Sequence, residues 1–229
     1  MNPNRFAIYF VPGSSEPWAQ FCTAWLGWDI ETGKAVAHPN LDGFGPVSAI
    51  TTVPRRYGFH ATIKPPFRLR GDRPKQALMR AAADLAANLP SVQITGLQVT
   101  AMGRFLALTA QEDTTALNAL AASVVRDLDR FRAPPSAQEL ARRRAANLTP
   151  QQETNLRDWG YPHVMDQFRF HMTLTGKLPK DQLTKTHDVL HKTLTPLLPQ
   201  PLWLTELALV GEDDDGFFHV IDRLPLMDR

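Results

Sequence analysis

The sequence contains a single cysteine, Cys22, among its 229 residues. One cysteine excludes an internal disulfide, and such usage is typical of proteins in a reducing compartment, so we expect a cytoplasmic location. Cys22 stands among tryptophan, phenylalanine and leucine residues in a segment with helical periodicity. We therefore expect a buried thiol rather than a nucleophile.

Long apolar runs are also missing. No stretch approaches the roughly 20 apolar residues that a membrane-spanning helix requires, although 43% of the residues are hydrophobic. Residues 1–6 contain no apolar block of the signal-peptide type. The composition predicts a globular chain with ample core for one large domain and with no membrane partner.

The sequence has only a small excess of positive charge: 25 Lys and Arg residues and 23 Asp and Glu residues give a formal net charge of +2. So small an excess argues against a general polyanion binder. Basic residues do gather around residues 55–68 and at residues 142–144, which suits a small anionic ligand better than a long nucleic acid. For residues 142–144 the alternative is an ordinary solvated helix surface.

Several catalytic signatures are absent. The sequence has no Gly-x-Ser-x-Gly elbow and no glycine-rich phosphate loop, which disfavours serine-triad and ATP-dependent chemistry. A zinc site built from His60, His163, His171 or His219 is the main alternative to a metal-independent role for these histidines. However, zinc commonly takes three protein ligands, and HExxH, cysteine pairs and a carboxylate close to the motifs described next are missing. We predict no metal and no cofactor.

Two short segments, by contrast, read alike: residues 59–63 (FHATI) and residues 170–174 (FHMTL). Each alternates apolar and polar residues with the period of two that is typical of a half-buried strand. On such strands His60 and Thr62 share one face, and His171 and Thr173 share the corresponding face. The pattern predicts two matched polar pairs on rigid elements that converge on one phosphate.

The surroundings of the two motifs repeat as well. Residues 74–89 and 179–194 have helical periodicity, and each run is followed by two strand-like segments. His60 and His171 are 111 positions apart, and Thr95 and Thr205, in the strand-like segments that follow, are 110 apart. This repeat predicts a single α+β domain of two similar lobes, approximately residues 1–112 and 113–229, with a helical appendage at residues 134–160.

The remaining segments fill in the expected order of elements. Residues 5–11 alternate and predict an opening strand, whereas residues 31–56 are rich in Gly and Pro and predict a long surface loop with at most a short strand near residues 47–52. The appendage reads as a pair of short helices, the second opened by Thr149 and Pro150.

Histidine pairs suit phosphodiester chemistry. Opening a cyclic phosphodiester needs a base for water, an acid for the departing alkoxide and donors to the charged oxygens. Imidazole can take either proton role because its ordinary pKa is about 6.5. The hydroxyl groups of Thr62 and Thr173 can donate to phosphate oxygens.

The motifs carry a resemblance to a known group. Residues 55–67 (RRYGFHATIKPPF), 159–162 (WGYP) and 168–176 (FRFHMTLTG) resemble the two-histidine (2H) phosphoesterase superfamily. The superfamily includes the bacterial RNA ligase/cyclic phosphodiesterases of LigT type, and the resemblance is closest to its DUF1045 branch, described as phosphonate-metabolism proteins.

The resemblance implies a bilobal α+β fold with two mostly antiparallel sheets, outer helices and a central cleft. It also implies metal-independent cleavage of a cyclic or linear phosphodiester, with His60 and His171 as the acid/base pair and Thr62 and Thr173 as phosphate-binding residues of the HxTx motifs. Which histidine is the acid stays open. The branch description suggests a cyclic phosphate of ribose.

Four further residues are candidate substrate contacts: Tyr9, Tyr57, Lys64 and Arg143. Tyr9 alternates with core-facing residues of the opening strand, with a sheet-edge position as its alternative. Tyr57 and Lys64 flank the first motif. Arg143 belongs to an arginine cluster that could clamp a second phosphate, which would favour a bisphosphorylated sugar over RNA.

The leading hypothesis is therefore a phosphodiesterase for a small cyclic nucleotide or sugar phosphate. The same four motif residues would also serve 2′,5′ RNA end processing or ligation, although few aromatic residues are interleaved with basic ones as single-stranded RNA binding usually requires. A nucleotide-binding module without turnover is the third hypothesis. No heptad pattern or exposed apolar stripe indicates an oligomeric state.

Overall fold

The structure is a computed structural model that describes residues 2–41, 43–112 and 114–228. Within these residues the chain is an α+β protein, which confirms the predicted fold class. The helices are α1 (Pro17–Leu26), α2 (Val47–Arg55), α3 (Lys75–Ala86), α4 (Thr115–Asp127), α5 (Ala137–Arg144), α6 (Pro150–Trp159) and α7 (Lys180–Leu194), with 3-10 turns at Asp129–Phe131 and Met165–Gln167. The strands are β1 (Phe6–Phe10), β2 (Trp28–Asp29), β3 (Lys34–Ala35), β4 (Ala61–Phe67), β5 (Val92–Ile94), β6 (Leu97–Met102), β7 (Phe105–Ala110), β8 (His171–Thr173), β9 (Leu202–Leu204), β10 (Glu206–Glu212) and β11 (Phe218–Pro225).

A seven-stranded antiparallel sheet organises the described part of the chain, in the order β11-β10-β1-β4-β8-β7-β6. The two motif strands, β4 and β8, are neighbours at its centre and pair at Ala61 and Met172. The two predicted sheets are therefore the two halves of one sheet, joined where the motifs meet.

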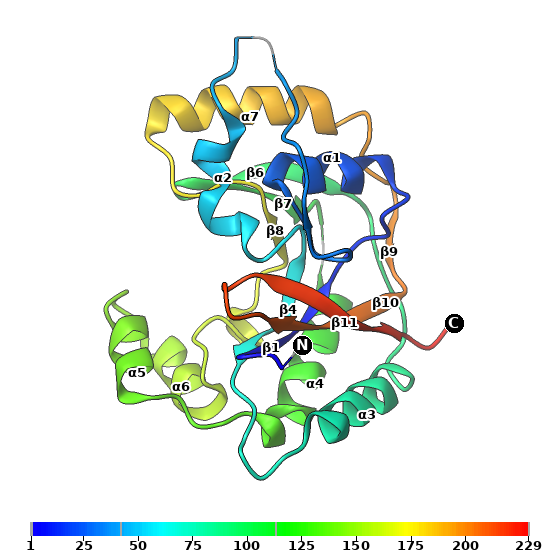
Figure 1. Ribbon diagram of the computed structural model, residues 1–229, viewed down its shortest axis with the longest axis vertical. Helices are drawn as coiled ribbons and strands as arrows, with labels where there is room; N and C mark the ends of the chain where they lie inside the picture. Colours follow the sequence, from blue (N-terminus) through cyan, green and yellow to red (C-terminus); the bar gives the residue numbers. More distant parts are fainter. Residues whose placement is uncertain (1, 42, 113, 229) are drawn as a thin grey trace.

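Each half of the sheet combines strands from both halves of the sequence. The β10–β11 hairpin lies beside β1, and the β6–β7 hairpin lies beside β8. A lobe boundary near residue 112 does not separate these halves, because the helix after each motif strand packs on the same half as that strand and the chain then crosses to the other half. Residue 113 itself lies outside the described residues. Accordingly α3 packs on β10 and β11, whereas α7 packs on β6 and β7 (Figure 1).

The pairing also reveals an approximate twofold relation. Ala61 pairs with Met172, and Gln93 of β5 pairs with Trp203 of β9, so that residues 111 and 110 positions apart face each other in antiparallel strands. Equivalent segments that pair antiparallel with each other lie on a twofold axis. The repeat in the sequence is therefore visible as a repeat in space.

One face of the sheet is apolar and carries the core. Ile8, Phe10, Ala61, Ile63 and Met172 are almost completely buried there. Burial of one Ile, Phe or Met side chain contributes about 1.5–3 kcal/mol. Because strand residues alternate between faces, this packing turns His60, Thr62, His171 and Thr173 toward the opposite face.

Helix α2 corrects one prediction. Residues 47–52 do not form a strand but belong to a helix in which Val47, Ile50, Thr51 and Pro54 are buried. Their spacing of three, four and seven residues gives one helical face, and burying that face outweighs the strand preference of β-branched residues. The Thr51 hydroxyl donates to the carbonyl of Val47 at 3.0 Å.

Helices α5 and α6 are the predicted appendage, and both begin with a capping box. The Ser136 hydroxyl accepts from the Glu139 backbone N–H at 3.2 Å, and the Thr149 hydroxyl accepts from that of Gln152 at 3.3 Å. Arg132 anchors the pair by donating to the carbonyl of Asp158 at 3.1 Å. Figure 1 shows both helices projecting to one side of the sheet.

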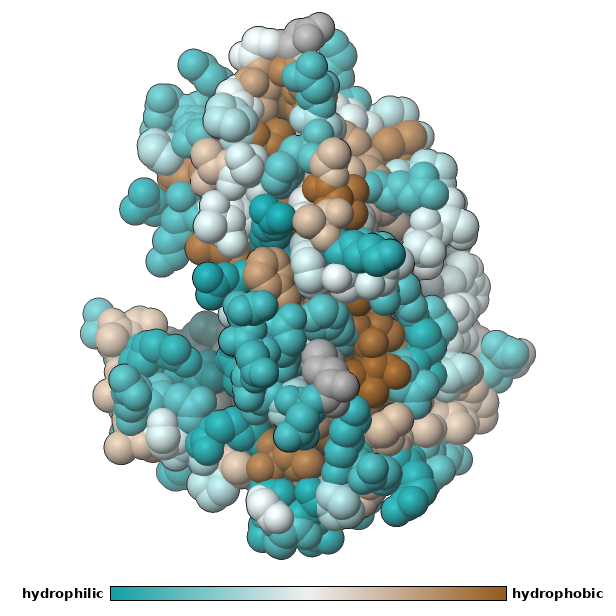
Figure 2. Space-filling model, viewed as in Figure 1, coloured by the Kyte–Doolittle hydropathy of each residue, from teal (hydrophilic) through white to brown (hydrophobic). Residues whose placement is uncertain are grey.

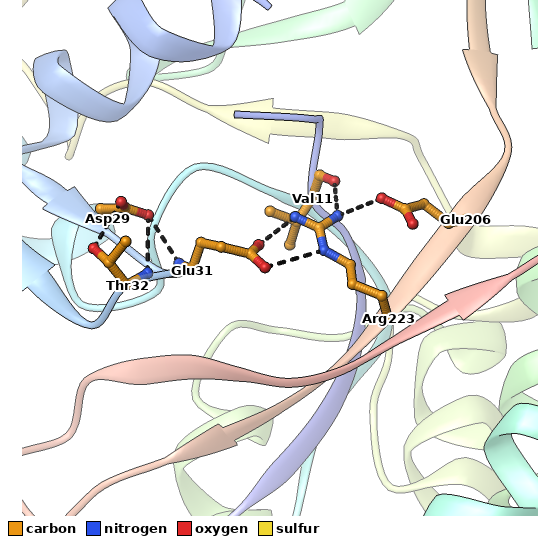
Figure 3. A network of polar contacts seen from close by, with 6 residues as sticks. All are labelled: Val11, Asp29, Glu31, Thr32, Glu206 and Arg223. Carbon is orange, nitrogen blue, oxygen red and sulfur yellow. Dashed lines mark hydrogen bonds and ion pairs between the residues drawn. The ribbon is translucent and has the colours of Figure 1, made fainter. Parts of the chain in front are cut away.

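A polar network ties the C-terminal hairpin to the end of β1 (Figure 3). Arg223 of β11 donates to the carbonyl of Val11 at 2.7 Å and to Glu206 at 2.8 Å, and it also binds Glu31. Asp29 in turn accepts from the Glu31 backbone N–H at 2.9 Å. One guanidinium thus fixes β1, β10 and the loop after β2 relative to one another.

Two expectations drawn from absences concern Cys22 and membrane helices. Cys22 is fully buried on α1, and burial raises the pKa of its thiol well above the ordinary value, as expected of a core cysteine. In the part of the chain that is described, no helix combines the length and apolar character needed to cross a membrane.

Candidate active site

A large cavity of about 1220 Å³ opens on the polar face of the sheet. All four motif side chains line it, from His60 and Thr62 at one motif to His171 and Thr173 at the other. Residues of α5 and of the segment after α6 form another wall. Figure 2 shows the surface hollowed beside the α5–α6 projection, with mainly hydrophilic residues around it.

The direction of β4 and β8 brings the motifs together. Ala61 and Met172 are paired, so in the antiparallel arrangement Thr62 lies next to His171, and His60 lies next to Thr173. Side chains of opposite residues in such strands have Cβ atoms about 4.5–5.5 Å apart. Two histidines and two hydroxyl groups therefore lie next to one another on the cavity wall.

His60 is held by contacts on each side of its ring. Nδ1 lies 3.0 Å from the carbonyl oxygen of Gly58, Nε2 lies 3.0 Å from the Thr62 hydroxyl, and the ring stacks on Tyr9 with centroids 3.8 Å apart. Gly58 has φ +68°, and a Cβ there would approach Cβ of Ile30 to 2.6 Å, so glycine is required at this turn. Burial lowers the pKa of His60 to about 4, with a further decrease from His171 against an opposing effect of the Gly58 carbonyl.

His171 repeats the same local bond. Its Nδ1 lies 2.8 Å from the carbonyl oxygen of Arg169, two residues before it, just as Gly58 precedes His60. Because a carbonyl only accepts, Nδ1 carries the proton in both rings, and Nε2 is the nitrogen that remains for proton transfer in the neutral form. Phe105 lies against this second ring at a centroid distance of 6.2 Å.

Lys64 is the one predicted contact that lies outside the cavity. Its ammonium group donates to the carbonyl of Val125 at 3.0 Å and lies 3.5 Å from Asp129, on the core side of the sheet. Tyr9 pairs with Thr62 but Ile8 pairs with Lys64, so Ile63 is an extra residue in β4. This β-bulge turns Lys64 to the face opposite to the one that strict alternation predicts. Burial lowers the pKa of Lys64 to about 8, although Asp129 opposes the change.

Tyr9, Tyr57 and Arg143 do line the cavity. Only part of the arginine cluster faces the cavity. Arg142 and Arg143 line it, whereas Arg144 forms an exposed ion pair with Glu153 at 2.6 Å. Arg143 is half-buried, and its guanidinium lies 4.6 Å from the centroid of the Tyr161 ring.

Sequence reasoning missed Arg5, Phe105 and Tyr161 among the cavity residues, and it named His163 only as a candidate zinc ligand. Arg5 had a signal, since it precedes Tyr9 by four positions and so shares its face of the strand. Tyr161 stood in the quoted WGYP segment without being singled out. The positions of Phe105 and His163 depend on how β7 and the segment after α6 pack.

The residues named for a zinc site are not assembled as one. His219 pairs with Asp213 at 2.6 Å in the β10–β11 hairpin and is not part of the cavity wall. Across residues 2–41, 43–112 and 114–228, no group of three or more His, Cys, Asp or Glu side chains is close enough to hold a metal ion.

Comparison with known proteins adds the family. Residues 62–219 match the family described as "Protein of unknown function (DUF1045)", a range that contains Thr62, His171 and Thr173. The chain belongs to the DUF1045 family. This agrees with the branch that the motifs indicated.

Curated relatives of this DUF1045 protein are longer. It is 38% identical over 176 residues to the ribose 1,5-bisphosphate phosphokinase PhnN of Janthinobacterium sp. (strain Marseille), a match covering 76% of this chain and 39% of the relative. It is 31% identical over 174 residues to the protein of the same name from Laribacter hongkongensis, covering 76% and 40%. The chain thus spans about two fifths of the length of these relatives.

Solved structures with a similar course of the chain include LigT of E. coli complexed with NADP+, at 13% identity and a TM-score of 0.49, with 99% of each chain covered. The protein TT0787 of Thermus thermophilus is similar at 15% identity and a TM-score of 0.44, with 98% of this chain and 99% of that one covered.

Proposed function

We propose that this DUF1045 protein is a metal-independent phosphodiesterase that opens a cyclic phosphodiester of a small nucleotide or ribose phosphate. The observation that carries the proposal is the convergence of two HxT motifs on one cavity, with both histidines oriented by the same bond to a carbonyl two residues earlier. A place in phosphonate metabolism, implied by the resemblance, is part of the same proposal.

The proton roles follow from the surroundings of His60. With a pKa of about 4 it is neutral at pH 7, which suits the base that accepts a proton from the attacking water. His171 in its protonated form then donates to the ring oxygen that leaves phosphorus. A P–O bond to water forms, the P–O bond of the ring breaks, and the product is a phosphate monoester with a free hydroxyl.

The threonines complete the site. In the structure the Thr62 hydroxyl lies within hydrogen-bonding distance of Nε2 of His60. When a phosphate is bound, Thr62 and Thr173 donate to its non-bridging oxygens instead, which frees Nε2 for the water. Donors placed in this way stabilise the charge that develops on the phosphoryl oxygens in the transition state.

The names of the relatives support a phosphorylated ribose as substrate. Both are named for ribose 1,5-bisphosphate, yet the match takes up only about 40% of their length. This chain has no glycine-rich phosphate loop, so we assign the named kinase activity to the remainder of those proteins. The part shared with this chain would act on a related sugar phosphate.

The test is turnover by protein treated with EDTA, with 2′,3′-cyclic nucleotides and ribose 1,2-cyclic phosphate as substrates and ³¹P NMR as the readout. We expect ring opening that survives EDTA and falls by at least about 10²-fold in both His60→Ala and His171→Ala, because each removes a group that transfers a proton. His191→Ala, on the exposed face of α7, is the matched control and should retain turnover.

Other results would redirect the assignment. Turnover that EDTA abolishes would point to a metal site. Stoichiometric binding of cyclic nucleotides without product would favour a binding module. Activity confined to RNA oligomers and steeply dependent on salt would favour RNA end processing.

A further inference from the structure

The sequence has three tyrosines, Tyr9, Tyr57 and Tyr161, and all three line the same cavity. They come from separate elements: β1, the turn before β4 and the segment after α6. Tyr9 stacks on His60 at 3.8 Å and Tyr57 lies 6.2 Å from the same ring. Tyr9 and Tyr57 therefore adjoin the reacting centre on the side of His60.

Two arginines accompany them. Arg5 is paired with Glu212, and the pKa of Arg5 is raised above its ordinary value chiefly by this bond, with a smaller contribution from Tyr57. Arg143 lies over the ring of Tyr161, and among the described residues no acidic group forms an ion pair with it. The positive charge of Arg143 thus remains available to a ligand.

Two donors in this group are unpartnered. The Tyr9 hydroxyl belongs to a completely buried side chain, and within the described residues neither it nor Nε of Arg143 has a hydrogen-bond partner. A buried donor without a partner costs folding free energy, and each such group in a native structure needs an explanation. A ligand anion that accepts hydrogen bonds from the Tyr9 hydroxyl and from Nε of Arg143 would explain why these two donors lack partners.

The protonation of the tyrosines fits an acceptor ligand. Burial raises the pKa of Tyr9 well above its ordinary value, and Tyr57 acts in the same direction. Burial also raises the pKa of Tyr161, against the opposing effect of Arg143. The hydroxyl groups of Tyr9 and Tyr161 therefore keep their protons at neutral pH and can donate hydrogen bonds to an anion.

We propose that Tyr9, Tyr57, Tyr161, Arg5 and Arg143 form a tyrosine–arginine subsite that binds a second phosphate of the substrate, a phosphate monoester on the sugar that carries the cyclic diester. This inference rests on the proposed function and names its substrate class. Phenolic hydroxyls and guanidinium groups match the several acceptor oxygens of a phosphate monoester.

The experiment compares matched substrates that differ only in the second phosphate: ribose 1,2-cyclic phosphate with and without a 5-phosphate, and adenosine 2′,3′-cyclic phosphate with and without a 5′-phosphate. We expect kcat/KM to be at least about 10²-fold higher for a phosphorylated form, mainly through a lower KM, because charge-assisted hydrogen bonds are the strong ones.

Two variants locate the effect. Arg143→Gln should reduce this preference by about 10-fold or more, and Tyr9→Phe, which keeps the ring on His60, should reduce it by a smaller factor. Arg144→Gln changes the neighbouring arginine, which is bound to Glu153 instead, and should keep the full preference. Equal kcat/KM for both members of each pair, or equal losses on both in Arg143→Gln, would overturn the subsite while leaving the phosphodiesterase assignment intact.

If no cyclic phosphodiester is turned over, the proposed function fails, and binding still decides the subsite. Inorganic phosphate would be titrated by calorimetry into the His60→Ala/His171→Ala double variant, which lacks the proton-transferring groups. Binding that Arg143→Gln abolishes and Arg144→Gln retains would support the subsite. Binding unaffected by Arg143→Gln, or no binding, would refute it.

Discussion

His60 and His171 share one orienting bond but differ in what surrounds their rings. Each donates from Nδ1 to a carbonyl two residues earlier, yet His60 also stacks on the buried Tyr9. Burial keeps His60 neutral over a wide pH range. An approximate twofold repeat thus provides two similar positions, and the local environment at His60 lowers the pKa of that histidine.

The lowered pKa of His60 predicts how stability depends on pH. The unfolded chain binds a proton at this histidine below about pH 6.5, whereas the folded chain binds it only below about pH 4. Between these values the unfolded state binds more protons, so the contribution of His60 is fully present above pH 6.5 and is lost as the pH falls toward 4.

We expect urea titrations to show less loss of unfolding free energy between pH 7 and pH 4.5 in His60→Gln than in the wild type. The difference should be about 1–3 kcal/mol. His191→Gln, an exposed histidine on α7, should lose as much as the wild type. Identical pH dependence in His60→Gln and wild type would show that His60 titrates normally.

For single residues, the sequence indicated that the motif side chains share one face, but it wrongly predicted that Lys64 contacts the substrate. Alternation around His60 correctly indicated which side chains share a face, because a strand with one buried face fixes that choice. The extra residue at Ile63 reverses the alternation one position later, and no turn or glycine in the sequence marks it. Tyr161 was missed for a related reason: it reaches the cavity only through the packing of α6.

Among the elements, those with strong local signals were predicted and those dependent on packing were not. Helices α5 and α6 were predicted as a pair of short helices, the second opened by Thr149 and Pro150, and α3 and α7 follow from helical periodicity. The segment of helix α2 was predicted to be part of a long surface loop with at most a short strand near residues 47–52. Contacts with segments distant in the sequence hold this helix in place. The carbonyl oxygen of Ile50, for example, accepts from the Gly176 backbone N–H at 2.7 Å near the second motif.

Arg223 offers a test of how the hairpin is attached. It bonds the Val11 carbonyl, Glu206 and Glu31 together, with only 24% of its side chain exposed. Arg223→Gln leaves these acceptors without their shared donor, and we expect a loss of about 1–3 kcal/mol in unfolding free energy. Arg144→Gln, which removes one exposed ion pair on the appendage, should leave the melting temperature nearly unchanged.

Thermal and urea unfolding of both variants would measure the difference. If Arg223→Gln were as stable as Arg144→Gln, the network in Figure 3 would contribute nothing measurable. Because Val11 directly follows the strand that carries Tyr9, we also expect a higher KM in Arg223→Gln than in Arg144→Gln.

For the whole molecule, the repeat in the sequence indicated two lobes but not how they are connected. Periodicity and spacing report which elements occur and in what order, and they do not report which strands become neighbours. The exchange of the β6–β7 and β10–β11 hairpins between the halves is a long-range choice. It places the motif strands side by side, so the site exists only when both ends of the chain are in place.

This exchange predicts that the two sequence halves cannot fold separately. A fragment of residues 1–112 would contain β1 and β4 without β10, and β6–β7 without β8, so strand edges and the shared apolar face would be exposed. We expect each of the fragments 1–112 and 113–229 to lack cooperative thermal unfolding by circular dichroism, whereas the intact chain unfolds in a single transition.

Mixing the two fragments provides the decisive comparison, because neither half supplies its own central pairing. We expect the mixture to regain a cooperative transition, and with it the phosphodiesterase activity if our functional assignment is correct, since β4 from one fragment and β8 from the other must pair to place His60 beside Thr173. A fragment that unfolds cooperatively by itself would instead show that each half is an independent lobe, and the shared sheet would then be an interface between two domains rather than the core of one.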